Sequence, residues 1–354
     1  MEVNIEKVLE SFSVSGIKSV ATFDSGLINK SYHILTHSKE EYVLQKINSA
    51  VFGDAEKMML NILLAHDQLK NEGDYFVPEI LFTRTGKPLM KDEVGNDWRL
   101  MRFISGSTTY DSTSDPKIAM EAGRIIGRFH HGTLNCSLNQ MHITLPDFHD
   151  MDFRTEWFLK GLGSASAQRL GEASGCIEQV ERLLDEGIGE VNSELPLRVT
   201  HNDTKLNNVL FDETSGKALC LIDLDTVMPG YLFHDFGDAL RTLCNTTEED
   251  DKNFESVSFN FELFESFLKG YISVMGKTLT PVEWEALPVS VTYMPFIMAV
   301  RFLTDYLFED RYYQTEYPEH NLIRCMNQLK LLDEIRVVKD DIKRAIDIVR
   351  RDFS

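Results

Sequence analysis

The spacing of apolar residues changes once along the chain. Between about residues 17 and 103, short alternating runs are typical of strands, whereas after about residue 115 apolar residues recur every three or four positions, as in helices. We expect strands at 20–23, 31–35, 42–47, 89–90 and 99–104, one helix at 55–70, and later helices at 117–134, 152–162, 175–186, 254–275, 281–308 and 319–350. The pattern predicts an α+β protein with an antiparallel-sheet lobe at 1–103 and a larger, mainly helical lobe at 104–354.

The second part contains the motif H-x-D-x-x-x-x-N at residues 201–208. Its spacing places a carboxylate, Asp203, five residues before the amide of Asn208. In phosphoryl-transfer enzymes such a carboxylate accepts the proton of the attacking hydroxyl, and the amide binds Mg²⁺. Asp223 follows an apolar run at 218–222, which is typical of a buried strand that delivers a carboxylate to the same metal. Together the three residues predict a site for phosphoryl transfer.

Each part of this motif also has a simpler interpretation. Asp and Asn are ordinary turn residues, so residues 201–208 alone could be a loop that enters a strand. Asp223 behind its apolar run is a separate requirement of the same mechanism, and it favours the active site. Lys205 lies two residues after Asp203, where its ammonium can approach the γ-phosphate and assist catalysis; a solvated lysine is the alternative.

The tripeptide at 235–237 is Asp-Phe-Gly, which protein kinases use to bind a metal. It lies 32 residues beyond Asp203 (235 − 203) and lacks a strand immediately before it, so Asp223 is the better metal ligand. We expect Asp235 and Asp238 to cap and orient the start of a helix at 239–243.

The loop at 23–31 lies between the first two expected strands, where kinases cover the nucleotide phosphates with backbone N–H groups. It contains Gly26 and Asn29 and predicts a nucleotide-binding loop, although an ordinary hairpin has the same composition. The phosphate-binding lysine should come from the third strand. There Gln45 and Lys46 are adjacent and face opposite sides, and the sequence alone does not choose between them.

Glu56 lies on the helix that follows this strand. It is either the partner of the phosphate-binding lysine or an exposed surface residue, and the sequence leaves both interpretations open.

Composition narrows the classes of partner. The chain has 354 residues, 43% of them hydrophobic and 26% charged, which is normal for a globular enzyme of two lobes. A formal net charge of −20 argues against nucleic acid or an anionic membrane as a partner, because both attract basic surfaces. Five scattered cysteines without a C-x-x-C pair indicate buried thiols in a reducing compartment, and the first residues lack the pattern of a signal peptide. We expect a cytoplasmic protein, whose oligomeric state the sequence does not predict.

These motifs resemble those of the kinase-like superfamily of aminoglycoside phosphotransferases and choline kinases, in which H-x-D-x-x-x-x-N and a later D-x-D replace the protein-kinase motifs. Within it, the chain is most similar to the N-acetylhexosamine 1-kinase branch. The similar segments lie at 44–48, 98–101, 148–150, 201–211, 222–230, 235–238 and 301–307. The resemblance implies a bilobal protein-kinase-like fold, ATP and Mg²⁺ as cofactors, and transfer of phosphate to the anomeric hydroxyl of a small sugar, GlcNAc or GalNAc.

The resemblance also implies roles for individual residues. Asp203 would be the catalytic base in contact with the sugar, Asn208 and Asp223 would bind Mg²⁺, and Asp225 would be an auxiliary carboxylate on the metal side. The adenine hinge would be formed by residues 101–104, which include Met101, Phe103 and Ile104.

Arg301 and Tyr312 resemble the wall of the family's sugar pocket. The alternatives are a helical ion pair between Arg301 and Asp305 and a packed aromatic at Tyr312. The chain departs from the family pattern at Gln45, which stands where the phosphate-binding lysine is expected.

Two other functions compete with a sugar 1-kinase. One is a kinase for another small hydroxyl substrate, such as choline, homoserine, methylthioribose or an aminoglycoside, and a cationic substrate would call for an acidic or aromatic cage. The other is a kinase-like binding module without activity, which the joint presence of Asp203, Asn208 and Asp223 argues against. A protein kinase is disfavoured because no A-P-E segment or activation loop follows Asp223.

Overall fold

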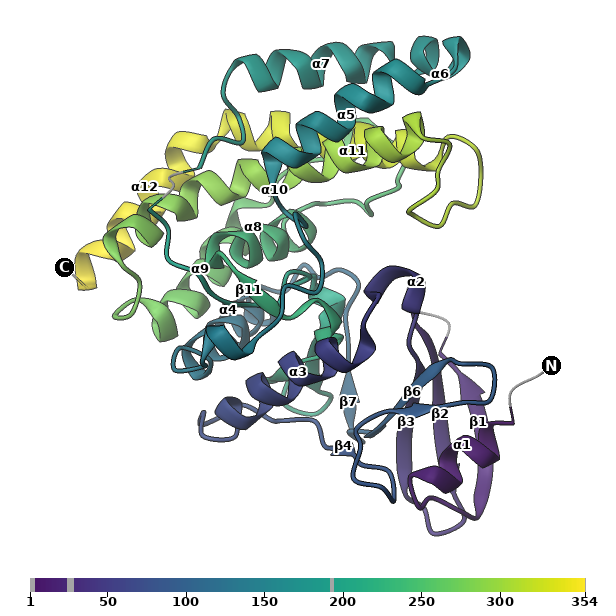
Figure 1. Cartoon of the computed structure of the whole chain (residues 1–354). Coiled ribbons are helices and arrows are strands. Elements are labelled where there is room, and N and C mark those ends of the chain that lie inside the picture. The colour runs from purple at the N-terminus through teal and green to yellow at the C-terminus, as the bar shows by residue number, and fades with distance from the viewer. Residues whose placement is uncertain (1–3, 24–28, 192–193, 354) are drawn as a thin grey trace.

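A computed structural model describes residues 4–23, 29–191 and 194–353 (Figure 1). The N-terminal part is an antiparallel sheet in the order β1-β2-β3-β6-β4, with β5 paired to β6. Its strands are β1 (Ile17–Thr22), β2 (Lys30–Thr36), β3 (Glu41–Lys46), β4 (Ile80–Leu81), β5 (Met90–Lys91) and β6 (Asp97–Arg102). The predicted antiparallel sheet is confirmed, and β4 is a short additional strand.

One face of this sheet is covered by a helix that the sequence pattern did not predict, α1 (Ile5–Ser11). Val8 and Leu9 of α1 are buried against Leu44 of β3 and Trp98 of β6. Since neighbouring strand residues face opposite sides, Leu44 and Lys46 share the α1 side, and Gln45 faces the other way.

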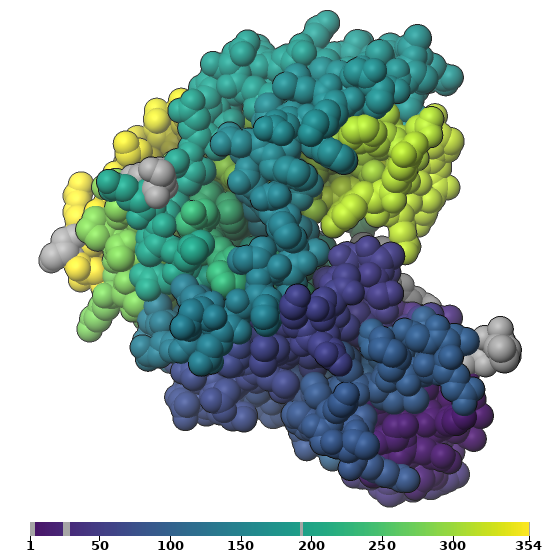
Figure 2. All heavy atoms as spheres, viewed as in Figure 1, coloured from purple at the N-terminus to yellow at the C-terminus, as the bar shows by residue number. Residues whose placement is uncertain are grey.

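The C-terminal part is mainly helical, as predicted, and Figure 2 shows it as the larger end of the molecule. Two small antiparallel sheets carry the predicted catalytic segments. One is formed by β7 (Ser107–Thr108), β9 (Val209–Asp212) and β10 (Ala218–Leu221), and the other by β8 (Arg198–Thr200) and β11 (Met228–Gly230). The helices are α4 (Pro116–Gly132), α5 (Met151–Ser164), α6 (Ala167–Glu172), α7 (Ser174–Asp185), α8 (Leu232–Leu243), α9 (Phe261–Met275), α10 (Pro281–Leu307), α11 (His320–Val337) and α12 (Lys339–Arg350).

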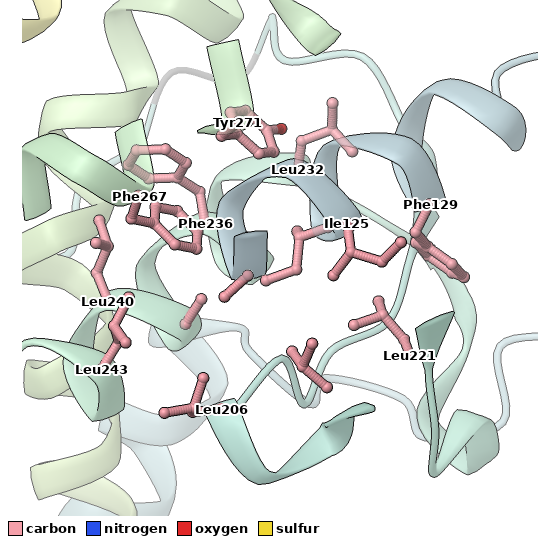
Figure 3. Packing of buried hydrophobic residues seen from close by; sticks show 14 of the residues in the cluster. Ile125, Phe129, Leu206, Leu221, Leu232, Phe236, Leu240, Leu243, Phe267 and Tyr271 are labelled. Carbon is pink, nitrogen blue, oxygen red and sulfur yellow. The ribbon is translucent and has the colours of Figure 1, made fainter. Parts of the chain in front are cut away.

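Helices α4 and α9 cross at very short range. A Cβ atom built on Gly270 of α9 would lie 1.9 Å from the carbonyl oxygen of Met120, and one built on Gly123 of α4 would lie 2.1 Å from that of Phe267. The crossing therefore requires glycine on both helices. Around it, aromatic and aliphatic side chains from α4, α8 and α9 and from the catalytic segments form one core, which includes Ile125, Phe129, Leu206, Leu221, Phe236 and Tyr271 (Figure 3).

The helix α3 (Ala55–Leu69) confirms the prediction at 55–70, but it packs on the C-terminal core rather than on the sheet's own core. Asn61 of α3 is fully buried. Its amide donates to the carbonyls of His142 (2.8 Å) and Val227 (2.9 Å), and its oxygen accepts from the backbone N–H of His142 (2.8 Å). The core therefore crosses the predicted boundary at residues 103 and 104. A short helix, α2 (Ser49–Phe52), precedes α3.

Two predicted helices are longer than those in the structure. The helix expected at 319–350 is two helices, α11 and α12, because Val338 leaves the helical conformation (φ −105°, ψ 11°). Acidic residues in the first turn of α12 then favour a new helix start. The helix expected at 254–275 begins at Phe261, where the side chain of Asn260 accepts a hydrogen bond from the N–H of Leu263 and caps it.

Among the described residues, one helix, α10, is long and apolar enough to span a membrane by composition. However, 83% of its most apolar window is buried inside the protein. In this structure α10 is the central helix of the C-terminal part, packed against α5, α8 and α11.

Candidate active site

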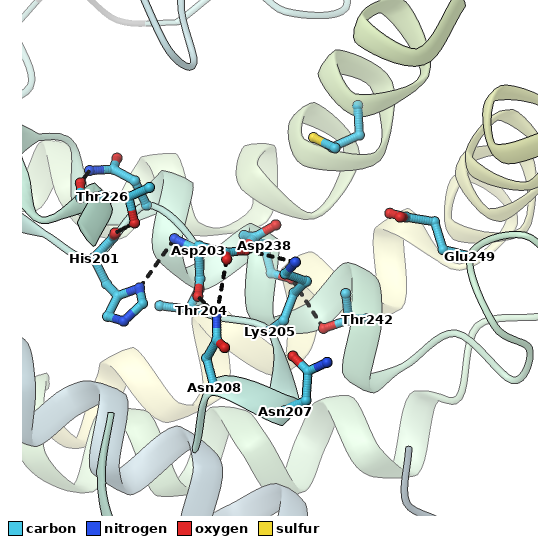
Figure 4. A network of polar contacts seen from close by, with 12 residues as sticks. His201, Asp203, Thr204, Lys205, Asn207, Asn208, Thr226, Asp238, Thr242 and Glu249 are labelled. Atoms are coloured by element: carbon cyan, nitrogen blue, oxygen red, sulfur yellow. Dashed lines mark hydrogen bonds and ion pairs between the residues drawn. The ribbon is translucent and has the colours of Figure 1, made fainter. Parts of the chain in front are cut away.

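The predicted catalytic motif forms a loop between β8 and β9, in which His201, Asp203 and Asn208 lie close together (Figure 4). His201 connects this loop to the end of β10. Nδ1 of His201 accepts from the backbone N–H of Asp203 (3.2 Å), so its Nε2 carries the proton and donates to the carbonyl of Ile222 (2.9 Å). The backbone N–H of Ile222 in turn donates to the carbonyl of Asn208 (2.9 Å). These bonds place Asp203, Asn208 and Asp223 at one site, as the sequence predicts.

The carboxylate of Asp203 is paired with the ammonium of Lys205, with 3.1 Å between Nζ and Oδ1. Burial raises the pKa of Asp203, but the charge and hydrogen bond of Lys205, together with His201 and Arg241, outweigh it and hold that pKa below its usual value. Asp203 in turn raises the pKa of Lys205. The pair is therefore a carboxylate and an ammonium at neutral pH, which suits a base beside a cation.

Asn208 and Asp223 present oxygen atoms that fit Mg²⁺. Nδ2 of Asn208 donates to the carbonyl of Asp203 (2.8 Å) and to its Oδ2 (3.0 Å), which leaves the amide oxygen of Asn208 available as a ligand. Asp223 lies in the left-handed region (φ 58°), two residues after the last residue of β10. Burial, then the charges of Asp225 and Asp203, raise its pKa to about 7, so a bound cation would stabilise its ionised form.

No three His, Cys, Asp or Glu side chains among the described residues cluster closely enough to hold a metal. A divalent cation here would therefore depend on Asn208, Asp223 and the oxygens of a substrate. Hard oxygen ligands and substrate phosphates are what Mg²⁺ prefers.

Asp225 differs from the prediction of a carboxylate available to the metal. It is almost fully buried, and its two oxygens already accept hydrogen bonds, one from Nη1 of Arg99 and the other from Nδ2 of Asn29. Both oxygens of Asp225 are therefore bound to residues of the N-terminal part, Arg99 and Asn29.

Asp235 orients the catalytic loop but does not cap a helix. The helix α8 begins at Leu232, so Asp235 and Asp238 lie inside it, which corrects the predicted start near residue 239. The oxygens of Asp235 accept from the backbone N–H groups of His201 and Asn202, both at 2.7 Å, and Oδ2 also accepts from Nε2 of His130 at 2.8 Å. Asp238 forms an ion pair with Arg241 (2.8 Å).

A cleft of about 480 Å³ lies between the sheet and the catalytic segments. One end is apolar and contains Val43 and three predicted hinge residues, Met101, Phe103 and Ile104. The other end contains Gln45 together with Asn208 and Asp223. This arrangement suits a molecule with a flat apolar ring and an anionic tail.

The structure separates the two candidates on β3. Gln45 lines the cleft, whereas Lys46 shares the α1 side of the sheet with Leu44. Among the described residues, Glu56 forms no ion pair with Lys46. Asn29 is buried and holds the N–H of Asn48 (2.9 Å), and Gly26 lies outside the described residues.

Arg99, which no sequence motif singles out, is buried at the polar end of the cleft. Arg99 stands opposite Gln45 in the pairing of β3 with β6. That pairing joins residues 54 positions apart, and neither local sequence predicts it.

A second cavity, of about 460 Å³, lies between α5, α10 and the segment after α10. It is lined by both predicted sugar-wall residues, Arg301 and Tyr312, with Arg154, Trp157, Thr304, Asp305, Phe308, Arg311 and Tyr313. Three of its buried polar atoms have no hydrogen-bond partner among the described residues: Nε of Arg154, Oγ1 of Thr304 and the hydroxyl of Tyr313. Such atoms are available to water or to the polar groups of a bound molecule.

Arg301 does not pair with Asp305, so the helical ion pair considered for it is wrong. The carboxylate of Asp305 accepts instead from the backbone N–H groups of residues 311–313 at 2.8–3.0 Å. The guanidinium of Arg301 lies over the ring of Phe148, 4.5 Å from its centre.

Phe148 also connects this cavity to the catalytic loop. Its ring contacts His149 (4.5 Å between centres), and Nε2 of His149 donates to the carbonyl of Asn202 (3.1 Å), the residue before Asp203. The second cavity and the cleft therefore approach the same catalytic loop.

Comparison with solved structures shows the same fold in several kinases. A microcompartment-associated aminopropanol kinase has a TM-score of 0.66 at 16% identity, over 95% of this chain and 97% of that one. A spectinomycin phosphotransferase, solved with ADP and spectinomycin, has 0.61 at 14%, over 95% and 97%. An amicoumacin kinase, solved with AMP-PNP and Ca²⁺, has 0.60 at 14%, over 88% and 87%.

The predicted kinase-like fold is thus confirmed over nearly the whole chain. A sequence model of the Phosphotransferase enzyme family matches residues 19–260, which contain the loop of Asp203 and Asn208, Asp223 and the cleft. The chain belongs to the Phosphotransferase enzyme family.

Proposed function

We propose that the protein transfers the γ-phosphoryl group of ATP to the anomeric hydroxyl of an N-acetylhexosamine, GlcNAc or GalNAc. The observation that carries the proposal is the position of the loop that bears Asp203. Asn208 of this loop lines the apolar-ended cleft. Asn202, next to Asp203, is connected through His149 and Phe148 to Arg301 of the polar, aromatic-walled cavity. The cleft suits ATP and the cavity suits the sugar. Relatives of the same fold, solved with ADP or AMP-PNP, support the choice of nucleotide.

In the proposed reaction, the sugar hydroxyl attacks the γ-phosphorus of ATP while its proton passes to Asp203. The bond between the γ-phosphorus and the oxygen that bridges it to the β-phosphate breaks, and ADP leaves. Lys205 lies beside Asp203 and would offset charge on the transferred group. Mg²⁺, held by Asn208 and Asp223, would neutralise phosphate charge when bound. Most of the catalysis is then positioning and charge stabilisation.

The chemistry of the cavity supports a sugar with an N-acetyl group. Trp157, Phe308 and Tyr312 supply aromatic surface for the apolar face of a sugar ring, and Arg154 and Arg301 supply donors. An N-acetyl group adds one amide donor, one acceptor and one methyl. A plain hexose would leave polar atoms of such a site without partners. The loss can reach several kcal/mol, on the order of a 100-fold lower kcat/KM or more.

The same cavity disfavours a cationic acceptor such as choline or an aminoglycoside. Three guanidinium groups line it, those of Arg154, Arg301 and Arg311, against one carboxylate, Asp305, which is already bound to backbone N–H groups. Arg301 even contributes to lowering the pKa of Arg154, after burial, to about 10. A positively charged substrate would be repelled there.

The test is ADP release in the presence of Mg-ATP and a panel of N-acetylhexosamines, parent hexoses and amino alcohols. We expect kcat/KM for GlcNAc or GalNAc at least ~100-fold above glucose and galactose. NMR of the product should place phosphate on O1. Equal use of plain hexoses, or phosphate on O6, would leave a kinase for a different small hydroxyl substrate; no turnover of any acceptor would favour a binding module.

A further inference from the structure

We infer that the cation that binds the nucleotide phosphates is Arg99 of β6, oriented by Asp225, and not a lysine of β3. The inference rests on the proposed use of ATP and identifies the residue that holds its phosphates. It also gives Asp225 a role other than that of a metal ligand.

The faces of the sheet support this assignment. Gln45, on the cleft side of β3, is directly opposite Arg99 of β6, and Lys46 is directly opposite Trp98, which is buried against α1. Arg99 and Gln45 both line the polar end of the cleft, with Asp223 and Asn208. β6 carries a second arginine that lines the cleft, Arg102, but it stands beyond Met101 and pairs with Glu40 and Glu79. On these two strands, the cation beside Gln45 and the proposed metal ligands is therefore Arg99.

The contacts of Arg99 fix its direction and leave donors available. Its Nε donates to Oε1 of Gln45 at 2.8 Å, and its Nη1 donates to Oδ1 of Asp225. A guanidinium has five N–H donors in a rigid fork. The hydrogen bonds that the described residues make with Arg99 use Nε and Nη1, so Nη2 is the nitrogen left for a ligand in the cleft.

Asp225 serves as the anchor of Arg99. It lies two residues after Asp223, and its second oxygen is held by Asn29. In protein kinases the phosphate-binding lysine is paired with a glutamate of the helix after the third strand, so a paired cation can still bind phosphate. Here that helix, α3, presents Ile62 and His66 to the cleft, and the anionic partner comes from the catalytic segment.

His66 gives an independent indication of a ligand at this end of the cleft. Its side chain is buried, lines the cleft, and has an Nε2 atom without a hydrogen-bond partner among the described residues. A buried polar atom without a partner is costly, and a phosphate or ribose oxygen nearby would satisfy it.

The experiment compares the binding of adenosine, ADP and ATP by calorimetry, with and without Mg²⁺. In Arg99→Met, the affinity for ADP and ATP should fall about 10- to 100-fold, because a hydrogen bond to a charged group contributes on the order of that ratio. Adenosine affinity should stay within about 2-fold. Lys46→Met, which removes a cation from the other face of the same sheet, is the matched control and should bind all three ligands as the wild type does.

Two further variants separate phosphate binding from structural support. Gln45→Lys in the Arg99→Met background returns a cation to the cleft from β3 and should restore part of the ADP affinity. Asp225→Asn should weaken ADP binding without shifting the Mn²⁺ concentration that gives half-maximal activity, and its effect should not add to that of Arg99→Met. If Arg99→Met does not fold, Arg99→Lys keeps the charge and should show a smaller loss confined to ADP and ATP.

Each outcome bears on the inference. Unchanged ADP affinity in Arg99→Met, or equal losses for adenosine and ADP, would overturn it and leave Arg99 as a structural residue. A shifted Mn²⁺ dependence in Asp225→Asn would return Asp225 to the metal. If the wild-type protein binds no adenine nucleotide, the proposed function fails and the inference fails with it; if the wild type binds ADP and only the Arg99 variants behave otherwise than expected, the inference alone fails.

Discussion

The ammonium of Lys205 lies 3.1 Å from the carboxylate of Asp203, and both belong to one short loop. A base needs a carboxylate that stays ionised, and a phosphoryl group in transfer needs a cation nearby. The two residues therefore have separable tasks that two substitutions can distinguish.

Asp203→Asn should lower kcat by about 10²-fold or more, because general-base catalysis contributes 10²–10⁴-fold. ADP affinity and the thermal midpoint of unfolding should change little, since the amide keeps an oxygen that can accept from Asn208. Steady-state kinetics and calorimetry provide the measurements. Full activity at saturating acceptor would remove Asp203 from the role of base.

Lys205→Met should lower kcat by roughly 10-fold or more, because it removes a charge that stabilises the transferred group. The KM for the acceptor should change much less than kcat, since Lys205 does not line the cavity that contains Arg301. A variant affected only in acceptor KM would contradict this division of tasks.

Arg301→Met should raise the KM for the sugar at least about 10-fold while the KM for ATP stays within about 2-fold, because Arg301 lines the second cavity and not the cleft. Arg344→Met is the matched control, since Arg344 is an exposed cation on α12 that pairs with Asp341. If both KM values rose together, the two cavities would not be independent.

His234 should make the protein less stable in acid. Burial lowers its pKa to about 4 from an ordinary value of 6.5. As the pH falls from 7, His234 binds a proton in the unfolded chain but stays neutral in the folded protein. The free energy of unfolding therefore decreases. Between pH 7 and pH 5 this loss is about 2 kcal/mol.

Urea unfolding at the two pH values tests this effect. His234→Phe retains an aromatic ring between Phe233 and Tyr293 and should show a shallower dependence of stability on pH than the wild type. His37→Gln, on an exposed turn, should not. Identical slopes for the wild type and His234→Phe would mean that another group carries the acid sensitivity.

Two Gly→Ala substitutions, one at the crossing of α4 and α9 and one on an open helix surface, should have opposite effects on stability. Gly270→Ala should destabilise the protein by about 1–3 kcal/mol or more, because the new Cβ meets the backbone of Met120. Gly163→Ala, in α5 with nothing within 4 Å of its Cβ, should stabilise it by about 0.5–1 kcal/mol. Denaturant unfolding of both gives the sign. A neutral Gly270→Ala would show that the helices can separate at little cost.

The sequence predicted the parts of the fold and site that depend on local spacing. The lobe order, the sheet and the catalytic motif follow from apolar period and from residues close in the chain. The role of Asp235 could not be predicted in this way. Its three partners, His130, His201 and Asn202, lie 33 to 105 positions away in the sequence.

Long-range pairing also explains the remaining gaps. The choice between Gln45 and Lys46 depends on which face of the sheet α1 covers, and α1 itself was not predicted. The commitment of Asp225 to Arg99 spans 126 positions. Such contacts exist only once the two parts of the chain have packed together.

The position of α3 bears on how such an enzyme can be controlled. In protein kinases, movement of the helix after the third strand turns activity on and off. Here Asn61 fastens that helix to the backbone of the C-terminal part through buried hydrogen bonds at its centre. Withdrawing it would strand buried polar groups and open the main core, at a cost of several kcal/mol. The buried hydrogen bonds of Asn61 therefore disfavour a switch of the protein-kinase kind, in which this helix swings away from the active site.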